Sequence, residues 1–302
     1  MKIYNYILAG FVSLGFLSSC GNEDSLIGEE IQINNIFLPD ANDHSKVAEL
    51  RRTFYKKENS FLLFNDTLYH EQIGTTASGE PYYKTETLDI LYSVGSTNQY
   101  ANNFIYGYLL KYDEQKEASA FLSERILPHL GKKLRPFSWL LVGSIKQHLY
   151  GDVYDNFKVL SGERCLAIAV GDLLSLSEGE KNELANSLQI EVLSGALASK
   201  PEMNEFYAFC EGLYEQFDFN YSDYEDHSVY TYTCGFLTKK KNPATGLEMN
   251  FHPNKSTDVH DYINLVFSSS EEEVRTKFEK YPKVLKKYDI VKTLIDELGY
   301  IF

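Results

Sequence analysis

The chain has 302 residues, of which 43% are hydrophobic and 14% are aromatic. This length is enough for one large domain or two small ones with a sizeable hydrophobic core. The formal net charge of −14 argues against binding to nucleic-acid phosphates, since the longest run of basic residues is the three lysines 239–241.

The first twenty residues have the pattern of a bacterial lipoprotein signal. One lysine, Lys2, precedes an apolar run that is too short to span a bilayer, and small residues then lead to a cysteine. The stretch Leu17-Ser18-Ser19-Cys20 resembles a lipobox, in which the cysteine is acylated and becomes the first mature residue. The sequence therefore predicts a signal peptide over residues 1–19 and lipidation of Cys20.

The residues after the predicted lipidation site are polar and acidic. The stretch GNEDSLIGEE, residues 21–30, resembles a surface-export signal of some Gram-negative anaerobes. We expect residues 20–45 to be a tether that holds the protein in the cell envelope, anchored to the outer membrane by acyl chains, since no later stretch is long and apolar enough to cross a bilayer. The remaining chain has no linker or repeat, so residues 46–302 are expected to form one domain.

The predicted strands and helices do not alternate regularly. Apolar runs predict strands at 60–66, 88–96, 138–145 and 164–170, and a strand or a buried loop at 229–237. Residues 113–131 predict a helix that ends near Pro128 and Gly131. From Val274 onward apolar residues recur at steps of three and four, and Pro282 is expected to begin a second helix there. Few strands and several helices in this order indicate an α+β fold.

A further helix is predicted from the capping box of Ser177 and Glu180 to about Ser199. Its apolar side chains point in nearly every direction, which is typical of a central, buried helix. Glu191 lies in the middle of this helix, where an isolated ionised carboxylate is costly. Glu191 is therefore expected to have a partner, to line a cavity, or to be the remnant of a site.

The surroundings of Glu191 resemble the H-E-x-x-H motif of zinc metallopeptidases. In that motif two histidines on one helix face hold the metal, and the acid between them is the general base for water. The matching residues here are Ile190, Glu191, Val192, Leu193 and Ser194. The acid is present, and both histidine positions are replaced, by Ile190 and Ser194.

Other segments extend the similarity to a family of zinc-binding metallopeptidase lipoproteins, or zinc metallohydrolases associated with substrate import. The apolar stretches WLLVGSI and CLAIAVGDLL precede the helix, and TDVHDYINLVF (257–267) and the tail 277–300 follow it in a similar order. The resemblance implies a zincin-like fold, with a small mixed sheet packed on a central buried helix and a helical C-terminal part.

The same resemblance implies a protein that has kept the fold and lost the hydrolytic site. Neither Ile190 nor Ser194 replaces imidazole as a zinc ligand, so Glu191 would be a vestigial general base and no cofactor is expected. Such a protein would be a non-catalytic accessory of outer-membrane nutrient uptake, with importer components or a polymeric nutrient as partners.

Three alternatives remain open at the level of sequence. Glu191 can be an ordinary helix acid that matches the family by chance. A working hydrolase could take zinc ligands from His252, Asp258, His260 and Asp261, although these residues also fit an exposed loop leading into a helix with Asp258 as its cap. The chain could also be an unrelated α+β surface lipoprotein that binds a glycan or a protein through its 23 tyrosines.

The cysteines beyond Cys20 are Cys165, Cys210 and Cys234. This odd number cannot pair completely, so at most one internal disulfide is expected. Cys165 lies in an apolar predicted strand and is expected to be a buried free thiol.

Overall fold

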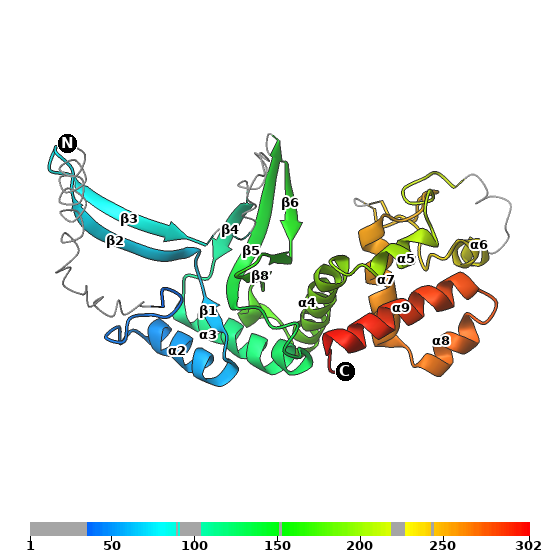
Figure 1. Cartoon of the computed structure of the whole chain (residues 1–302), viewed down its shortest axis with the longest axis horizontal. Helices are drawn as coiled ribbons and strands as arrows, with labels where there is room; N and C mark the ends of the chain where they lie inside the picture. The colour runs from blue at the N-terminus through cyan, green and yellow to red at the C-terminus, as the bar shows by residue number, and fades with distance from the viewer. Residues whose placement is uncertain (1–34, 89, 91–103, 151–152, 219–226, 243–244) are drawn as a thin grey trace, which may run out of the picture. The chain divides into compact units, whose positions relative to one another are not determined.

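The computed structural model of this chain contains a mixed sheet and a set of helices (Figure 1). The structure describes residues 35–88, 90, 104–150, 153–218, 227–242 and 245–302. The predicted signal peptide, Cys20 and most of the strand predicted at 88–96 lie outside these residues. None of the described helices is both long and apolar enough to span a bilayer. The prediction of an α+β fold with a mixed sheet is confirmed.

The main sheet combines parallel and antiparallel pairing. Its strands are β1 (Phe61–Leu63), β4 (Phe104–Tyr108), β5 (Ser138–Tyr150), β6 (Val153–Phe157), β7 (Val159–Ser161) and β8 (Leu166–Ala169). β1 and β8 run parallel to β5 on its two sides, and β7 pairs antiparallel with β8, which makes the order β1-β5-β8-β7. β4 and β6 pair antiparallel with the later part of β5. The strands predicted at 60–66, 138–145 and 164–170 are therefore confirmed.

β5 contributes to two hydrophobic cores. Trp139, Leu140, Leu141 and Val142 are completely buried, and successive side chains of a strand point to opposite faces of the sheet. Trp139 and Leu141 pack in the core shared with the helices, whereas Leu140 and Val142 pack with Phe61 in the second core. Burial on both faces explains why this segment is a continuous apolar run in the sequence.

Two helices and a hairpin precede β5 in the chain. Helix α2 (Lys46–Glu58) is capped by the hydroxyl of Ser45. β2 (Thr67–Thr75) and β3 (Pro81–Thr87) form a separate two-stranded sheet. Helix α3 (Tyr112–Phe121) continues through a π turn and a 3-10 turn that contains Pro128, which confirms the helix predicted at 113–131.

The described C-terminal residues are largely helical, as predicted. The helices are α5 (Met203–Ala208), α6 (His227–Cys234), α7 (Lys255–Ser268), α8 (Glu271–Lys277) and α9 (Pro282–Leu298). Pro282 begins α9, as predicted, because the first turn of a helix makes no use of the N–H that proline lacks.

α6 corrects the prediction of a strand or a buried loop at 229–237. Tyrosine, threonine and valine favour strands in general, but here the segment packs along α9 and is helical up to Cys234. Gly235 follows with a φ of +92°, a left-handed conformation that favours glycine and ends the helix. Tertiary packing has overridden local propensity in this segment.

α7 begins earlier than predicted. Its cap is Asn254, whose side-chain oxygen accepts a hydrogen bond from the Thr257 backbone N–H at 2.8 Å. Asp258 lies inside the helix and is completely buried. The prediction of an exposed loop with Asp258 as the helix cap is therefore wrong.

Helix α4 (Glu178–Ala198) contacts β7 on the sheet side and α7 and α9 on the side of the C-terminal helices (Figure 1). The predicted capping box is confirmed, because the side chains of Ser177 and Glu180 accept hydrogen bonds from each other's backbone N–H groups. The prediction of a helix buried all round is wrong in part. Leu188 is fully buried, whereas 35% of the Glu191 side chain is exposed.

Cys165, Cys210 and Cys234 are all buried free thiols. The prediction for Cys165 is confirmed, and burial raises the pKa of its thiol to about 12. The Cys210 thiol donates to the backbone oxygen of Cys234 at 3.2 Å, so this contact between the two residues is a hydrogen bond and not a disulfide.

A buried ion pair joins α7 to α9. The Lys287 Nζ atom lies 2.6 Å from Asp258 Oδ2, and neither side chain is exposed. The same ammonium donates to the backbone oxygen of Gly235 at 2.9 Å, and Tyr214 donates its hydroxyl to Asp258 Oδ2 at 2.7 Å. Three aromatic rings have their centroids 4.3, 4.7 and 5.1 Å from the ammonium: Phe206, Tyr262 and Phe236. This cluster compensates in part for the loss of hydration on burial of two charges.

We expect Lys287→Met to lower the free energy of unfolding by about 3–5 kcal/mol, because it leaves a buried carboxylate without its cation. Urea denaturation measures this change. Lys292→Met is the matched control on the same helix, since the Lys292 amine contacts Glu271 at 3.3 Å near the surface and should contribute little. Equal effects of the two substitutions would contradict the assignment of Lys287 as a buried, paired charge.

Candidate ligand groove between two helices

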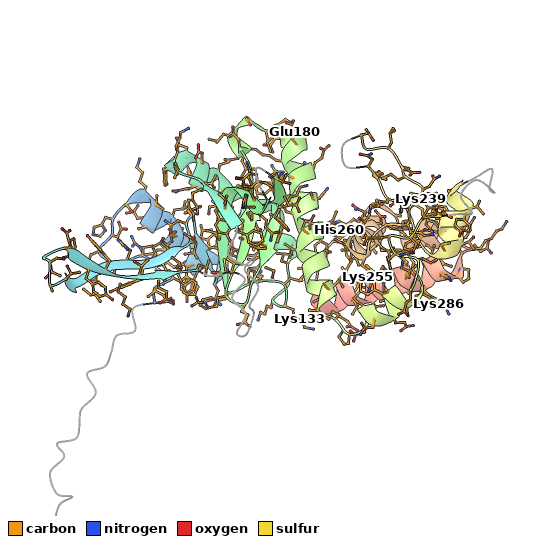
Figure 2. The ribbon with its side chains drawn as sticks, turned by 90° about the horizontal axis from the view of Figure 1, so that it is seen from above. Lys133, Glu180, Lys239, Lys255, His260 and Lys286 are labelled. Atoms are coloured by element: carbon orange, nitrogen blue, oxygen red, sulfur yellow. The ribbon has the colours of Figure 1, made fainter. Side chains whose placement is uncertain are left out.

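Glu191 of α4 has a partner on α7. Its Oε2 atom lies 3.4 Å from Nε2 of His260, and 35% and 26% of the two side chains are exposed. Figure 2 labels His260 on α7, near α4, with Lys255 at the start of the same helix. The structure thus brings together the predicted vestigial base and one of the four proposed metal donors.

The acid–imidazole pair lines a groove of about 610 Å³. The groove extends over the second half of α4, the start of α7, the edge strand β7 with the turn after it, and the segment 133–136. Its polar side chains include Ser161, Glu163, Ser194, Ser199 and Ser256. Of the three possibilities considered for Glu191, the structure therefore supports both a partner and a position in the wall of a cavity.

On each of the two helices, the polar residues that line the groove are spaced so that they lie on one face of that helix. Glu191 and Ser194 are three residues apart on α4, and Ser256 and His260 are four apart on α7. Ile190, the first of the replaced histidine positions, instead packs against the main core. The groove thus has two hydroxyl groups, one carboxylate and one imidazole on facing helices.

β7 presents the edge of the main sheet to the groove. In an antiparallel pair, residues alternate between those that bond to the neighbouring strand and those that point their backbone groups away from it. Gly162 N–H bonds to Cys165 O and Ala169 N–H bonds to Lys158 O, so the alternation directs the backbone groups of Val159 and Ser161 away from β8. Both residues line the groove.

The other three predicted metal donors do not join His260. Asp258 is paired with Lys287, and Asp261 Oδ2 accepts a hydrogen bond from Thr238 at 2.5 Å. His252 is buried against Phe236, with ring centroids 5.1 Å apart, and burial lowers its pKa. Within the described parts of the chain, no group of three or more histidine, cysteine or acidic side chains could hold a metal ion.

Sequence reasoning missed Ser256 and the edge strand β7. The spacing of Ser256 and His260 would have indicated a shared helix face if Asn254, a favoured capping residue, had been chosen as the start of α7. β7 has only three residues, and a strand this short has no recognisable periodicity of its own.

Comparisons with known proteins identify no relative. No protein-family model matches this sequence, and no match is found among the curated proteins or the solved structures.

We expect Asp261→Asn to stabilise the protein at neutral pH. Burial, opposed by the hydrogen bond from Thr238, raises the pKa of Asp261 from 3.8 to about 6. Because the folded state holds this proton more tightly than the unfolded state, the contribution of Asp261 to stability is complete below pH 3.8. It is lost as the pH rises through about 6, at roughly 1.4 kcal/mol per pH unit. Denaturation curves at pH values below and above this window measure the difference.

The comparison needs a control carboxylate on the surface. Asp296→Asn serves as this control, since it removes an acid that lies 3.9 Å from Lys292 and has 54% of its side chain exposed. If Asp261→Asn has the same slope of stability against pH as the natural protein, Asp261 does not hold its proton more tightly in the folded state.

Proposed function

We propose that this chain is a lipid-anchored cell-envelope protein with a zincin-like fold, in which the groove between α4 and α7 binds a ligand without hydrolysing it. The ligand is a segment of a polymeric nutrient, or of an importer component, and the protein acts as an accessory to uptake across the outer membrane. The observation that carries the proposal is the contact between Glu191 and His260 in the wall of the groove.

The Glu191–His260 pair has a different arrangement from a hydrolytic zinc site. A catalytic zinc ion takes three protein ligands and leaves one position for water, and the general base must be free to accept a proton from that water. Here the acid contacts the only imidazole that lines the described groove, and the positions of the two motif histidines hold Ile190 and Ser194. These residues suit recognition of a ligand better than its cleavage.

The walls of the groove favour an extended ligand. The outward backbone groups of Val159 and Ser161 can form hydrogen bonds with a polypeptide in β conformation, which is a common way to bind a peptide at a sheet edge. The hydroxyl groups of Ser194 and Ser256 and the Glu191–His260 pair face the same space. Polar groups at several points along a groove fix the register of a chain-like molecule.

A hydrolase with divergent zinc ligands is the second candidate. The contact between Glu191 and His260 favours it, because carboxylate and imidazole are two of the donor types that zinc uses. The Oε2 and Nε2 atoms of these two residues are 3.4 Å apart. His260 and Glu191 would then hold the metal, with further ligands from outside the pair.

Zinc titration of the purified protein separates the two candidates. We expect no stoichiometric, tightly held zinc, because two side chains are too few to retain the ion, and we expect His260→Ala to change nothing in the titration. His70→Ala is the matched control, since His70 lies on the exposed hairpin. One zinc per chain that is lost in His260→Ala and kept in His70→Ala would overturn the non-catalytic proposal.

Glu191→Gln provides the second part of this test. It should lower the free energy of unfolding by no more than about 1 kcal/mol, because glutamine has nearly the same shape and the contact with His260 is partly exposed. Complete loss of a hydrolytic activity in this variant, with the fold preserved, would instead show that Glu191 takes part in a hydrolytic site, as a metal ligand or as the general base.

The anchoring part of the proposal is tested at Cys20. We expect Cys20→Ser to abolish acylation and to release the protein from the membrane fraction, because each buried methylene of an acyl chain contributes about 0.8 kcal/mol to anchoring. Fractionation and the intact mass of the protein measure the two effects. Ser18→Ala is the control, and membrane association that survives Cys20→Ser would contradict lipidation at this residue.

A further inference from the structure

A second groove, of about 460 Å³, lies beside α5 and reaches the first residue of α7. Its walls come from α5, from the turn that follows α5, and from Lys255, the first residue of α7. The lining residues are Asn204, Tyr207, Ala208, Glu211, Gly212, Tyr214, Gln216 and Lys255. Lys255 directly precedes Ser256 of the first groove, so the same turn of α7 contributes a residue to each groove.

Two tyrosine rings form a corner in this groove. The ring centroids of Tyr207 and Tyr214 are 6.1 Å apart and their planes are inclined at 76°. The ammonium of Lys255 lies 4.8 Å from the centroid of Tyr207 and 5.8 Å from that of Tyr214. The electron-rich faces of aromatic rings attract cations at these distances. The corner is therefore an ammonium site that the chain fills with one of its own side chains.

One carboxylate contacts the tyrosine corner and another lines the groove beside it. Tyr214 donates its hydroxyl to Asp258 Oδ2 at 2.7 Å, which fixes the position of its ring. The Oδ1 atom of this completely buried carboxylate has no hydrogen-bond partner among the described residues. Burial first, and then the charge of Asp258, raise the pKa values of both tyrosines. Glu211 adds a carboxylate to the groove wall.

The helix dipole disfavours a cation at the position of Lys255. It occupies the first turn of α7, where the helix dipole places partial positive charge. Its side chain is exposed, and the four-carbon chain of lysine is flexible, so the ammonium can leave the rings at little steric cost. The contacts with the two aromatic rings are what holds the ammonium in place.

We infer that the corner formed by Tyr207 and Tyr214 is a recognition site for an alkylammonium group of a ligand, such as the side chain of a lysine in a bound polypeptide. Lys255 occupies the site in the free protein, and an incoming ammonium displaces it. Glu211 balances the added charge. This site does not depend on the proposed function of the first groove, because it shares no lining residue with that groove.

A small amine measures this recognition in the full chain. The probe is Nα-acetyl-lysine amide, and the comparison compound is the same molecule acetylated on its side-chain nitrogen. We expect Lys255→Gln to bind the amine about fivefold more tightly than the natural protein, since an exposed cation–π contact is worth up to about 1 kcal/mol. NMR titration gives the dissociation constant, and the methylene next to the ammonium should shift upfield over the rings.

Further variants distinguish the contribution of the aromatic ring of Tyr207 from an effect of the substitution on folding. In the Lys255→Gln background, Tyr207→Phe should keep most of the binding because the ring remains, and Tyr207→Leu should abolish it. Lys84→Gln is the matched control, since Lys84 lies 5.7 Å from the ring of Tyr69 on the hairpin and outside the groove. Any one of three results would overturn the inference. The first is equal binding of the amine by the natural protein and Lys255→Gln, and the second is equal binding of the amine and its acetylated form. The third is equal binding of the amine by the Tyr207→Phe and Tyr207→Leu variants.

Discussion

The buried pair of Lys287 and Asp258 fixes the position of α7, and both grooves depend on that position. α7 supplies Ser256 and His260 to one groove and Lys255 to the other. The pair joins the first turn of α7 to the middle of α9, and its Nζ and Oδ2 atoms also bind Gly235 and Tyr214. Because a buried charge without a partner is strongly destabilising, arrangements of α7 and α9 that separate Lys287 from Asp258 are disfavoured.

α4 connects this C-terminal arrangement to the sheet. One set of its side chains, including Leu188 and Leu193, packs in the core that also contains Trp139 of β5. Glu191 and Ser194 lie in the wall of the groove that α4 shares with α7. A helix that packs on both sides cannot be apolar in every direction if a groove is to remain open beside it, and this explains why a carboxylate is tolerated in its middle.

The parts of the fold that local sequence determines were predictable, and the parts that depend on distant contacts were not. The capping box of α4, Pro282 at the start of α9 and the apolar run of β5 are each specified within a few residues. Asn254 and Asp258 are both good helix caps, and the choice between them depends on Lys287, which is 29 residues beyond Asp258. Likewise, the pairing of Glu191 with His260 joins residues of two helices and has no local signature.

The carboxylate of Asp258 links the stability of the C-terminal helices to the shape of the second groove. Its Oδ2 atom receives both the Lys287 ammonium and the Tyr214 hydroxyl, so the residue that anchors α7 also orients a ring that lines the groove. A well-packed apolar pair could give α7 and α9 similar or greater stability, but it could not accept the hydrogen bond of the tyrosine hydroxyl. The costly burial of two charges is therefore accompanied by a fixed position for Tyr214 in the wall of the second groove.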